Sequence, residues 1–327
     1  MNRSIRALAL SSLLLVGAAA CGSDADTTDA TTAPAATEAA PAPTGAAPAT
    51  DAAPATDAAP ATDPGELPER IVSLSPTATE MVFAIGAGDL VVAVDDMSNY
   101  PEAALAVQTD LSGFTPNVEA IAAYEPDLVL IDGSIPELQP QLEALDIDVW
   151  AGPAAMTLDD AYAQIEQLGA ATGHVADAAA LVAQMQGDIE AAVASVPALS
   201  EPPSYYHELD PTLYSVTSNT FIGEVYGLFG LRNIADETEA STTYPQLSPE
   251  FVISQSPDLI FLADTKCCDA TAESVAEREG WSTIGAVATG LVIPLDDDVA
   301  SRWGPRVVDL VEAIAAAVQQ VVTLSAG

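Results

Sequence analysis

From residue 67 onward, short runs of apolar residues alternate with segments in which apolar residues recur every three or four positions. Runs that are apolar at consecutive positions are typical of parallel strands buried on both faces, and the intervening segments are typical of amphipathic helices. This alternation predicts mostly parallel α/β structure. The predicted strands are 71–74, 90–94, 127–132 and 147–152 in the first half, and 205–209, 258–263 and 291–296 in the second.

Between these two halves the strand pattern stops. From about residue 158 to 196 the chain is rich in alanine, and its apolar residues have helical spacing. This predicts one long helix over Val175–Val196, ended by Pro197. A final amphipathic helix is predicted over 304–322, with Pro305 in its first turn. The predicted fold is α/β, with two Rossmann-like lobes of mostly parallel sheets joined by a single long bridging helix.

An internal repeat supports the division into two lobes. The stretch "PNVEAIAAYEPDLVLI" from residue 116 aligns with "SPEFVISQSPDLIFL" from residue 248, which places Glu119 over Glu250. A second pair, "TEMVFAIG" from residue 79 and "GEVYGLFG" from residue 223, places Glu80 over Glu224. Two matches in the same order predict two similarly built lobes, and clefts between such domains are where small ligands bind.

The first 66 residues have a different composition. Two arginines precede a short apolar run that ends at Cys21, which is typical of an export signal of the lipoprotein kind. An ordinary cleaved signal with an incidental Cys21 is the alternative. Residues 22–66 are almost entirely Ala, Thr, Pro and Asp and cannot form a core, so they predict an extended tether. The predicted parts are a signal 1–21, a tether 22–66, a first lobe 67–173, a bridging helix 174–197 and a second lobe 198–327.

The charge balance limits the possible partners. The chain has 48 acidic and 8 basic residues, a net charge of −40. Such a surface repels nucleic acid and anionic lipid, so contact with a membrane is expected through a lipid anchor only. It also disfavours strongly anionic ligands unless the few cations converge on one site.

The chain's motifs do not indicate catalysis or a metal site. Cys267 and Cys268 are adjacent and can either close a disulfide or remain thiols. Thiol–disulfide exchange is one alternative function, but the pair lacks the spacing of a C-x-x-C motif. The only histidines are His174 and His207, too few for a metal site built on histidine ligands from both lobes. No cofactor is expected.

Several segments together resemble one known family. "RIVSLSPTATEMVFAIGAGDLVVAVDD", "NYP", "NVEAIAAYEPDLVL" and "SRWGPRVVDLVEAI" are similar to periplasmic binding proteins that deliver ferric siderophores, cobalamin or haem to ABC importers. The resemblance covers roughly residues 68–322. It implies a long helix bridging two lobes, and one docking glutamate per lobe for arginines of the permease, at Glu119 and Glu250. Alternatively, each glutamate favours the positive start of its own helix.

In such a fold the ligand meets the loops that follow the carboxyl ends of the strands. The Cys267–Cys268 pair lies in one of these loops, where a disulfide would stiffen the loop and offer an apolar surface. Arg306 is expected either in a structural ion pair or at the ligand. The predicted ligand contacts are Ser75, Pro76, Tyr100, Phe114, Thr115 and Ser134 from the first lobe, and Glu208, Ser218, Asn219, Tyr244, Lys266, Arg302 and Trp303 from the second.

The sequence therefore predicts a monomeric, lipid-anchored substrate-binding protein that captures an iron-siderophore, cobalamin or haem and presents it to the permease dimer of an ABC importer. It performs no chemistry in this interpretation. A ligand sensor without transport would have the same sequence features and remains an alternative. The charge favours a corrinoid or a hydroxamate complex over a catecholate complex.

Overall fold

The computed structural model describes residues 67–197, 201–238 and 241–325. These residues form two parallel four-stranded sheets with helices around them, which confirms the predicted two-lobe α/β fold. The strand order is β2-β1-β3-β4 in the first sheet and β6-β5-β7-β8 in the second. The two orders are the same. The strand order reverses between β1 and β3 in the first sheet and between β5 and β7 in the second. The predicted signal 1–21, the tether 22–66 and Cys21 lie outside the described residues.

The elements of each lobe are short. In the first lobe they are β1 (Ile71–Ser73), α1 (Pro76–Ala84), η1 (Gly88–Leu90), β2 (Val91–Val94), η2 (Glu102–Val107), α2 (Val118–Ala122), β3 (Leu128–Ile131), α3 (Leu138–Glu143) and β4 (Asp148–Ala151). In the second they are β5 (Ser204–Glu208), α6 (Phe221–Gly227), β6 (Arg232–Asn233), η3 (Ile234–Glu237), α7 (Pro249–Gln255), β7 (Leu259–Leu262), α8 (Ala272–Ala276), η4 (Trp281–Thr283), α9 (Gly285–Thr289), β8 (Val292–Pro294) and α10 (Asp297–Ser301).

The internal repeat corresponds to one helix–strand unit in each lobe. Asn117 caps α2 by accepting a hydrogen bond from the amide of Ala120, and Ser248 caps α7 by accepting one from the amide of Phe251. Each helix leads into a fully buried strand, β3 or β7, next to the first strand of its sheet. The similar sequences therefore build the same unit twice, at equivalent places in the two sheets.

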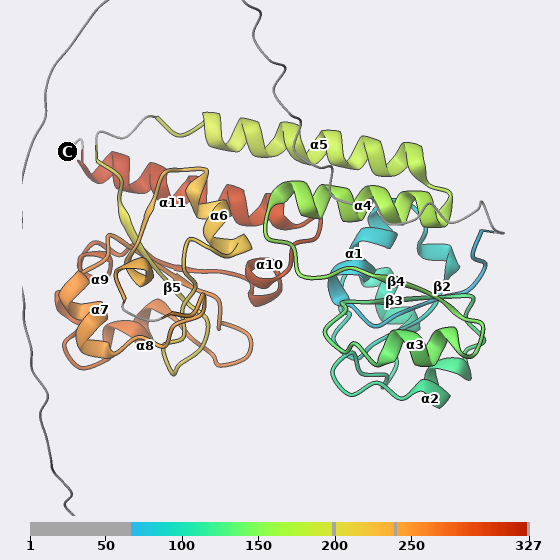
Figure 1. The fold of residues 1–327 in the computed structure, drawn as a ribbon. Helices are drawn as coiled ribbons and strands as arrows, with labels where there is room; N and C mark the ends of the chain where they lie inside the picture. The colour runs from blue at the N-terminus through green and yellow to red at the C-terminus, as the bar shows by residue number, and fades with distance from the viewer. Residues whose placement is uncertain (1–66, 198–200, 239–240, 326–327) are drawn as a thin grey trace, which may run out of the picture. The chain divides into compact units, whose positions relative to one another are not determined.

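Three long helices, α4 (Leu158–Thr172), α5 (Val175–Ala194) and α11 (Val307–Ser325), lie along one side of both sheets (Figure 1). Helix α5 is the predicted long helix, and α4 and α11 pack against it. Helix α11 begins two residues after Pro305, so the prediction that Pro305 lies in its first turn was wrong. Residues 304–306 form a turn instead, in which Arg306 pairs with Glu80.

The main hydrophobic cluster is shared by both lobes and the long helices. It includes Ile71 and Val94 of the first sheet, Tyr205 and Phe261 of the second, and Ile314 of α11. Among the described residues, helix α11 is long and apolar enough to cross a membrane, and its buried side chains pack in this cluster. The shared core and the packing of α4 and α11 on α5 connect the two lobes.

Candidate functional site

The carboxyl edges of the two sheets meet at one contact. The loop after β2 carries Asn99, and the segment after β8 carries Asp298. The Asn99 amide donates to the Asp298 carboxylate over 3.0 Å, and the Arg302 guanidinium donates to the Met97 carbonyl over 3.1 Å. Ligands of open α/β sheets bind beyond the carboxyl ends of the strands. We therefore take the loops that follow the carboxyl ends of the strands in the two lobes as the candidate site, and we call them the inter-lobe loops.

A buried ion-pair cluster lies beside this contact. Glu80 of α1 has a side chain that is 1% exposed, and it accepts hydrogen bonds from Arg302 at 2.8 Å and from Arg306 at 2.5 Å. The Arg306 guanidinium also stacks 4.3 Å above the ring of Tyr100. Arg306 therefore forms a structural ion pair in this structure, one of the two roles expected for it. The cluster fastens the start of α11 to the first lobe.

The equivalent glutamate of the second lobe makes a related contact. Glu224 of α6 accepts a hydrogen bond from the backbone amide of Leu158, the first residue of α4, over 3.0 Å. Burial raises the pKa of Glu224, and this hydrogen bond opposes the shift. The two glutamates of the second sequence match therefore have similar roles. Glu80 of the first lobe contacts the start of α11, and Glu224 of the second lobe contacts the start of α4.

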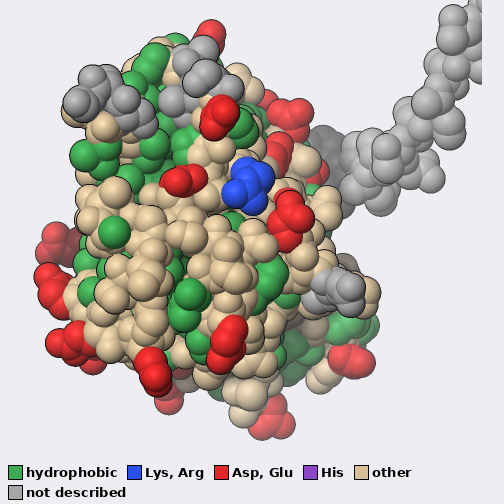
Figure 2. Space-filling model, turned by 90° about the vertical axis from the view of Figure 1, so that its left-hand side faces the viewer, with side chains coloured by type: hydrophobic (Ala, Val, Ile, Leu, Met, Phe, Trp, Pro, Cys, Tyr) green, Lys and Arg blue, Asp and Glu red, His purple; other side chains and the backbone are tan. Residues whose placement is uncertain are grey.

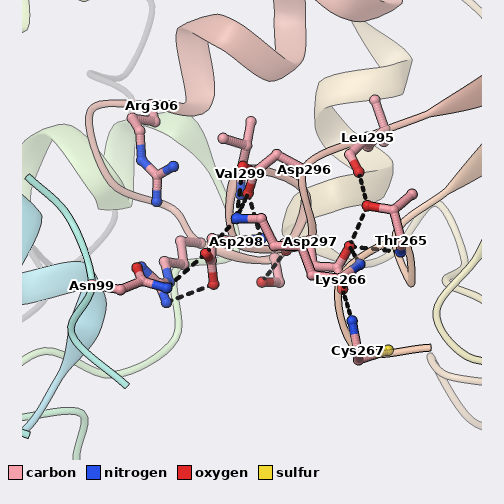
Figure 3. Close-up of polar contacts among 12 residues, drawn as sticks. Asn99, Thr265, Lys266, Cys267, Leu295, Asp296, Asp297, Asp298, Val299 and Arg306 are labelled. Atoms are coloured by element: carbon pink, nitrogen blue, oxygen red, sulfur yellow. Dashed lines mark hydrogen bonds and ion pairs between the residues drawn. The ribbon is translucent and has the colours of Figure 1, made fainter. Parts of the chain in front are cut away.

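The loop that carries Cys267 and Cys268 is held by three consecutive aspartates, residues 296–298 (Figure 3). The Asp297 carboxylate accepts hydrogen bonds from the backbone amides of Thr265, Lys266 and Cys267, at 2.8 to 3.0 Å. It also accepts one from the Thr265 hydroxyl, at 2.9 Å. One carboxylate therefore fixes the start of this loop.

Lys266 and the two flanking aspartates connect the loop to the contact between the lobes. The Lys266 ammonium lies 2.7 Å from Asp296 and 2.8 Å from Asp298. Burial alone would raise the pKa of Asp298, but hydrogen bonds from Lys266 and Asn99 and the charge of Arg302 outweigh it, so the pKa is lowered. Asp298 is therefore an anion that bridges the cysteine loop and the first lobe.

A second charged group lies inside the second lobe, at the carboxyl ends of β5 and β7. Glu208 is fully buried and forms two hydrogen bonds of 2.6 Å with the Arg278 guanidinium, which lies 4.5 Å from the Trp281 ring. Asp264 is also fully buried, and neither of its carboxylate oxygens has a hydrogen-bond partner among the described residues. Burial, followed by the charge of Glu208, raises the pKa of Asp264 to about 7.

Three predicted ligand contacts have partners in the interior. Ser75 is buried and caps α1 by accepting from the amide of Ala78, Glu208 pairs with Arg278, and Arg302 pairs with Glu80. The sequence predicts these side chains at the ligand, whereas the structure uses them within the protein. The half-buried Trp303 likewise donates its indole N–H to Gln164 over 2.9 Å.

Most of the other predicted contacts are exposed. Phe114 is 76% exposed, Tyr100 45% and Tyr244 49%. Ser218 is also exposed, but its backbone amide and its hydroxyl both donate hydrogen bonds to the Asp236 carboxylate. The remaining exposed members of the set are Thr115, Ser134, Asn219 and Lys266, and Pro76 is half-buried.

Cys267 and Cys268 are both exposed and are joined as a disulfide between adjacent residues. Among the residues that the structure describes, no group of three or more His, Cys, Asp and Glu side chains is arranged to hold a metal ion. His207 is fully buried, and this burial lowers its pKa to about 3. Its Nδ1 atom lies 2.9 Å from the Tyr226 hydroxyl, so it belongs to the core.

Sequence reasoning missed the anchoring aspartates and Arg278. The run of three aspartates directly after a predicted strand was a usable signal, because parallel strands end at the site edge. Arg278 gave no comparable signal, since it lies 70 residues from Glu208 in the chain.

A cavity of about 480 Å³ lies behind the inter-lobe contact, between α1, α5 and α11. Its wall includes Tyr100, Met185, Arg306, Asp309 and Glu312. On the outer face of the second lobe, acidic side chains are scattered widely, and basic side chains are visible at one place (Figure 2). Anionic ligands therefore meet an unfavourable field over this face.

Comparison with known proteins gives a consistent result. The family model described as periplasmic binding protein matches residues 71–299. A cobalamin-binding protein of Halobacterium salinarum is 34% identical over 250 residues, which cover 74% of this chain and 67% of that protein. An uncharacterized ABC transporter substrate-binding lipoprotein of Bacillus subtilis, YvrC, is 32% identical over 76% of this chain and 79% of its own.

A solved structure agrees with these matches. The periplasmic heme-binding protein RhuT from Roseiflexus, in its apo form, has a TM-score of 0.68 and 27% identity, covering 77% of this chain and 99% of that one. The family match, the sequence identities and the two-lobe parallel fold agree, and we conclude that this chain belongs to the periplasmic binding protein family.

Proposed function

We propose that this protein is the substrate-binding component of an ABC importer and that it captures a cobalamin-type ligand between its two lobes. The observation that carries the proposal is the meeting of the two carboxyl edges at Asn99 and Asp298, which places the inter-lobe loops around one region. Relatives that bind cobalamin support the choice of ligand, as does the acidic surface, which disfavours anionic complexes.

The proposed ligand contacts are the exposed side chains of the inter-lobe loops. Tyr100, Phe114 and Tyr244 offer apolar area for the face of a macrocycle, and the exposed Ser134 and Asn219 offer hydrogen bonds to peripheral amides. We do not retain Ser75, Glu208 and Arg302 as contacts, because their partners lie inside the protein.

Delivery would require docking on the permease. Glu119 and Glu250 lie in the first turns of α2 and α7, both are exposed, and neither has an ion-pair partner within the described part of the chain. Helices α2 and α7 occupy equivalent places in the two lobes, so the pair suits a two-fold symmetric partner that presents arginines. A lipid on Cys21 and the 22–66 tether would keep the protein at the outer face of the membrane.

Isothermal titration calorimetry of the folded part, residues 67–327, tests the ligand. We expect saturable one-to-one binding of cyanocobalamin and weaker or absent binding of haem and of a ferric hydroxamate. Tight binding of either of these with none of cyanocobalamin would reject the cobalamin assignment but keep the binding function. No binding of any of the three would contradict the proposed function itself. Loss of membrane association in a Cys21→Ser variant tests the anchor.

A further inference from the structure

The loop that carries the disulfide of Cys267 and Cys268 is held in place by polar contacts at its start. The pair follows β7, one of the two strands between which the strand order reverses. It therefore stands at the position where α/β sheets receive ligands. Both residues are exposed. The polar contacts at the start of the loop involve its backbone amides, the Thr265 hydroxyl and the Lys266 ammonium.

Asp297 makes most of these contacts. Its carboxylate accepts three consecutive backbone amides of the loop, the last of them from Cys267 over 2.9 Å. A hydrogen bond from an amide to a charged acceptor is stronger than one between neutral groups, so this arrangement restricts the loop more than ordinary turn hydrogen bonds do. In Figure 3, Cys267 lies on the far side of the aspartates from Asn99, which belongs to the first lobe.

The chemistry of the pair differs from that of its surroundings. Within three residues on either side lie Asp264, Lys266 and Asp269, and the three anchoring aspartates lie beneath the loop. A disulfide has no charge and no strong hydrogen-bonding group, so it is an apolar surface among charges. Exposing such a surface is unfavourable unless a ligand covers it, and a rigid apolar surface favours a rigid apolar partner.

We propose that the Cys267–Cys268 disulfide is a ligand contact, a fixed apolar surface on which the face or edge of a macrocyclic ligand packs, and that Asp297 is its positioning residue. This rests on the proposed function and adds a specificity element from the second lobe to the exposed Tyr100 and Phe114 of the first. A small hydrophilic ligand would gain nothing from this surface. The ligand class that fits is therefore a macrocycle with an extended apolar face.

The first test compares affinities for cyanocobalamin by calorimetry. Replacing both cysteines in a Cys267→Ser, Cys268→Ser variant should weaken binding about tenfold, the effect of losing some tens of Å² of apolar contact. Because both residues are exposed, the variant should unfold at the same temperature as the wild type. Equal affinity of variant and wild type would overturn the inference and leave the proposed function intact. No binding by the wild type would reject both.

The second test separates positioning from charge. Asp297→Asn removes the charged acceptor of three amides and should weaken binding about threefold to tenfold, with the disulfide still present by intact mass. The control is Asp269→Asn, which makes the same change of charge in the same loop at a residue with a positive φ of 55°, a conformation that Asn tolerates. This control should bind as the wild type does. Equal effects of the two substitutions would reject the positioning role of Asp297.

The third test uses the unaltered protein. Dithiothreitol should reduce the disulfide more slowly when cyanocobalamin is bound, because a covering ligand blocks access of the attacking thiolate. Alkylation followed by intact mass at several times gives the rate with and without ligand. An unchanged rate at saturating ligand would show that the sulfur atoms remain uncovered and would overturn the inference.

Discussion

Asp264 has no exposed surface and no hydrogen-bond partner for its carboxylate oxygens among the described residues. Burial and the neighbouring Glu208 raise its pKa from 3.8 to about 7, with Arg278 opposing the shift only partly. Between about pH 4 and 7 the folded protein therefore holds a proton here that the unfolded chain has already released. The contribution of Asp264 to the free energy of unfolding falls as the pH rises through this range.

An Asp264→Asn variant keeps the shape of this side chain without the charge. We expect it to be more stable than the wild type by roughly 1–3 kcal/mol at pH 8, with the difference vanishing below pH 3.8, where both states of the wild type are protonated. Urea unfolding at pH 4, 6 and 8 measures this. A variant that is less stable than the wild type at pH 8 would show that the carboxylate has favourable partners.

Glu80 poses the opposite case, a buried charge with two partners. Arg302 also donates to Met97, Asn99 and Asp298, whereas Arg306 donates to Glu80 alone and stacks on Tyr100. Arg302→Met should therefore cost about 3 kcal/mol, because it removes one of the two partners of the buried Glu80 and also the donor to Met97, Asn99 and Asp298.

The matched change, Arg306→Met, should cost only about 1 kcal/mol, since Glu80 keeps Arg302 as a partner. Urea unfolding curves with a common slope give both values. An equal or larger loss for Arg306→Met would mean that Arg306 is the main partner of Glu80.

Helix α6 offers a comparison between two glycines of one element. A Cβ atom at Gly223 would lie 2.3 Å from the Thr217 carbonyl oxygen and 2.6 Å from the Ser218 Cα, both backbone atoms that cannot move away easily. A Cβ at Gly227 would meet nothing within 4 Å. Gly223 therefore permits the close approach of α6 to the loop before it, and Gly227 has no such role.

Substitution by alanine should separate the two. Gly223→Ala should lower the free energy of unfolding by roughly 1–3 kcal/mol through the clash. Gly227→Ala should raise it by about 0.5 kcal/mol, because alanine favours the helix. Thermal unfolding of both variants measures this, and a stable Gly223→Ala protein would show that the loop can shift.

The elements themselves were largely predictable. Strands such as β3 and β7 are apolar at every position, and this pattern is independent of the rest of the chain. Helix α10 was missed because Asp297–Ser301 is five residues long and mostly polar. Its position depends on contacts made by Asp296 and Asp298 with residues about 30 or more positions away, which a local pattern does not contain.

At the scale of the whole molecule, the repeat in the sequence predicted the repeat in topology, but not the use of each residue. Glu80 and Glu224 were matched as equivalents, and the structure gives both a contact at the start of a long helix. Arg302 was predicted at the ligand because it follows the last strand. Besides Asp298, its partners in the structure come from the first lobe, more than 200 residues away in the chain. Pairings across the lobes are set by tertiary packing, so the sequence alone could not assign them.

The equivalent places of α2 and α7 in the two lobes also determine how docking can be tested. If Glu119 and Glu250 each meet arginines of one permease subunit, reversing both charges in a Glu119→Arg, Glu250→Arg variant should abolish uptake. It should leave calorimetric affinity for cyanocobalamin unchanged, because both residues lie on exposed helix starts. Each single reversal should weaken transport less, since the other lobe still docks.

The matched control is Glu102→Arg with Glu273→Arg. These glutamates are also exposed, one in each lobe, and each lies in the first turn of a short helix. The control makes the same change in net charge and in the first-turn charges, so a general electrostatic effect would slow uptake in both proteins. Uptake of radiolabelled cyanocobalamin by cells that carry each variant makes the comparison. Normal uptake by the Glu119, Glu250 variant would contradict docking and favour a role in ligand sensing.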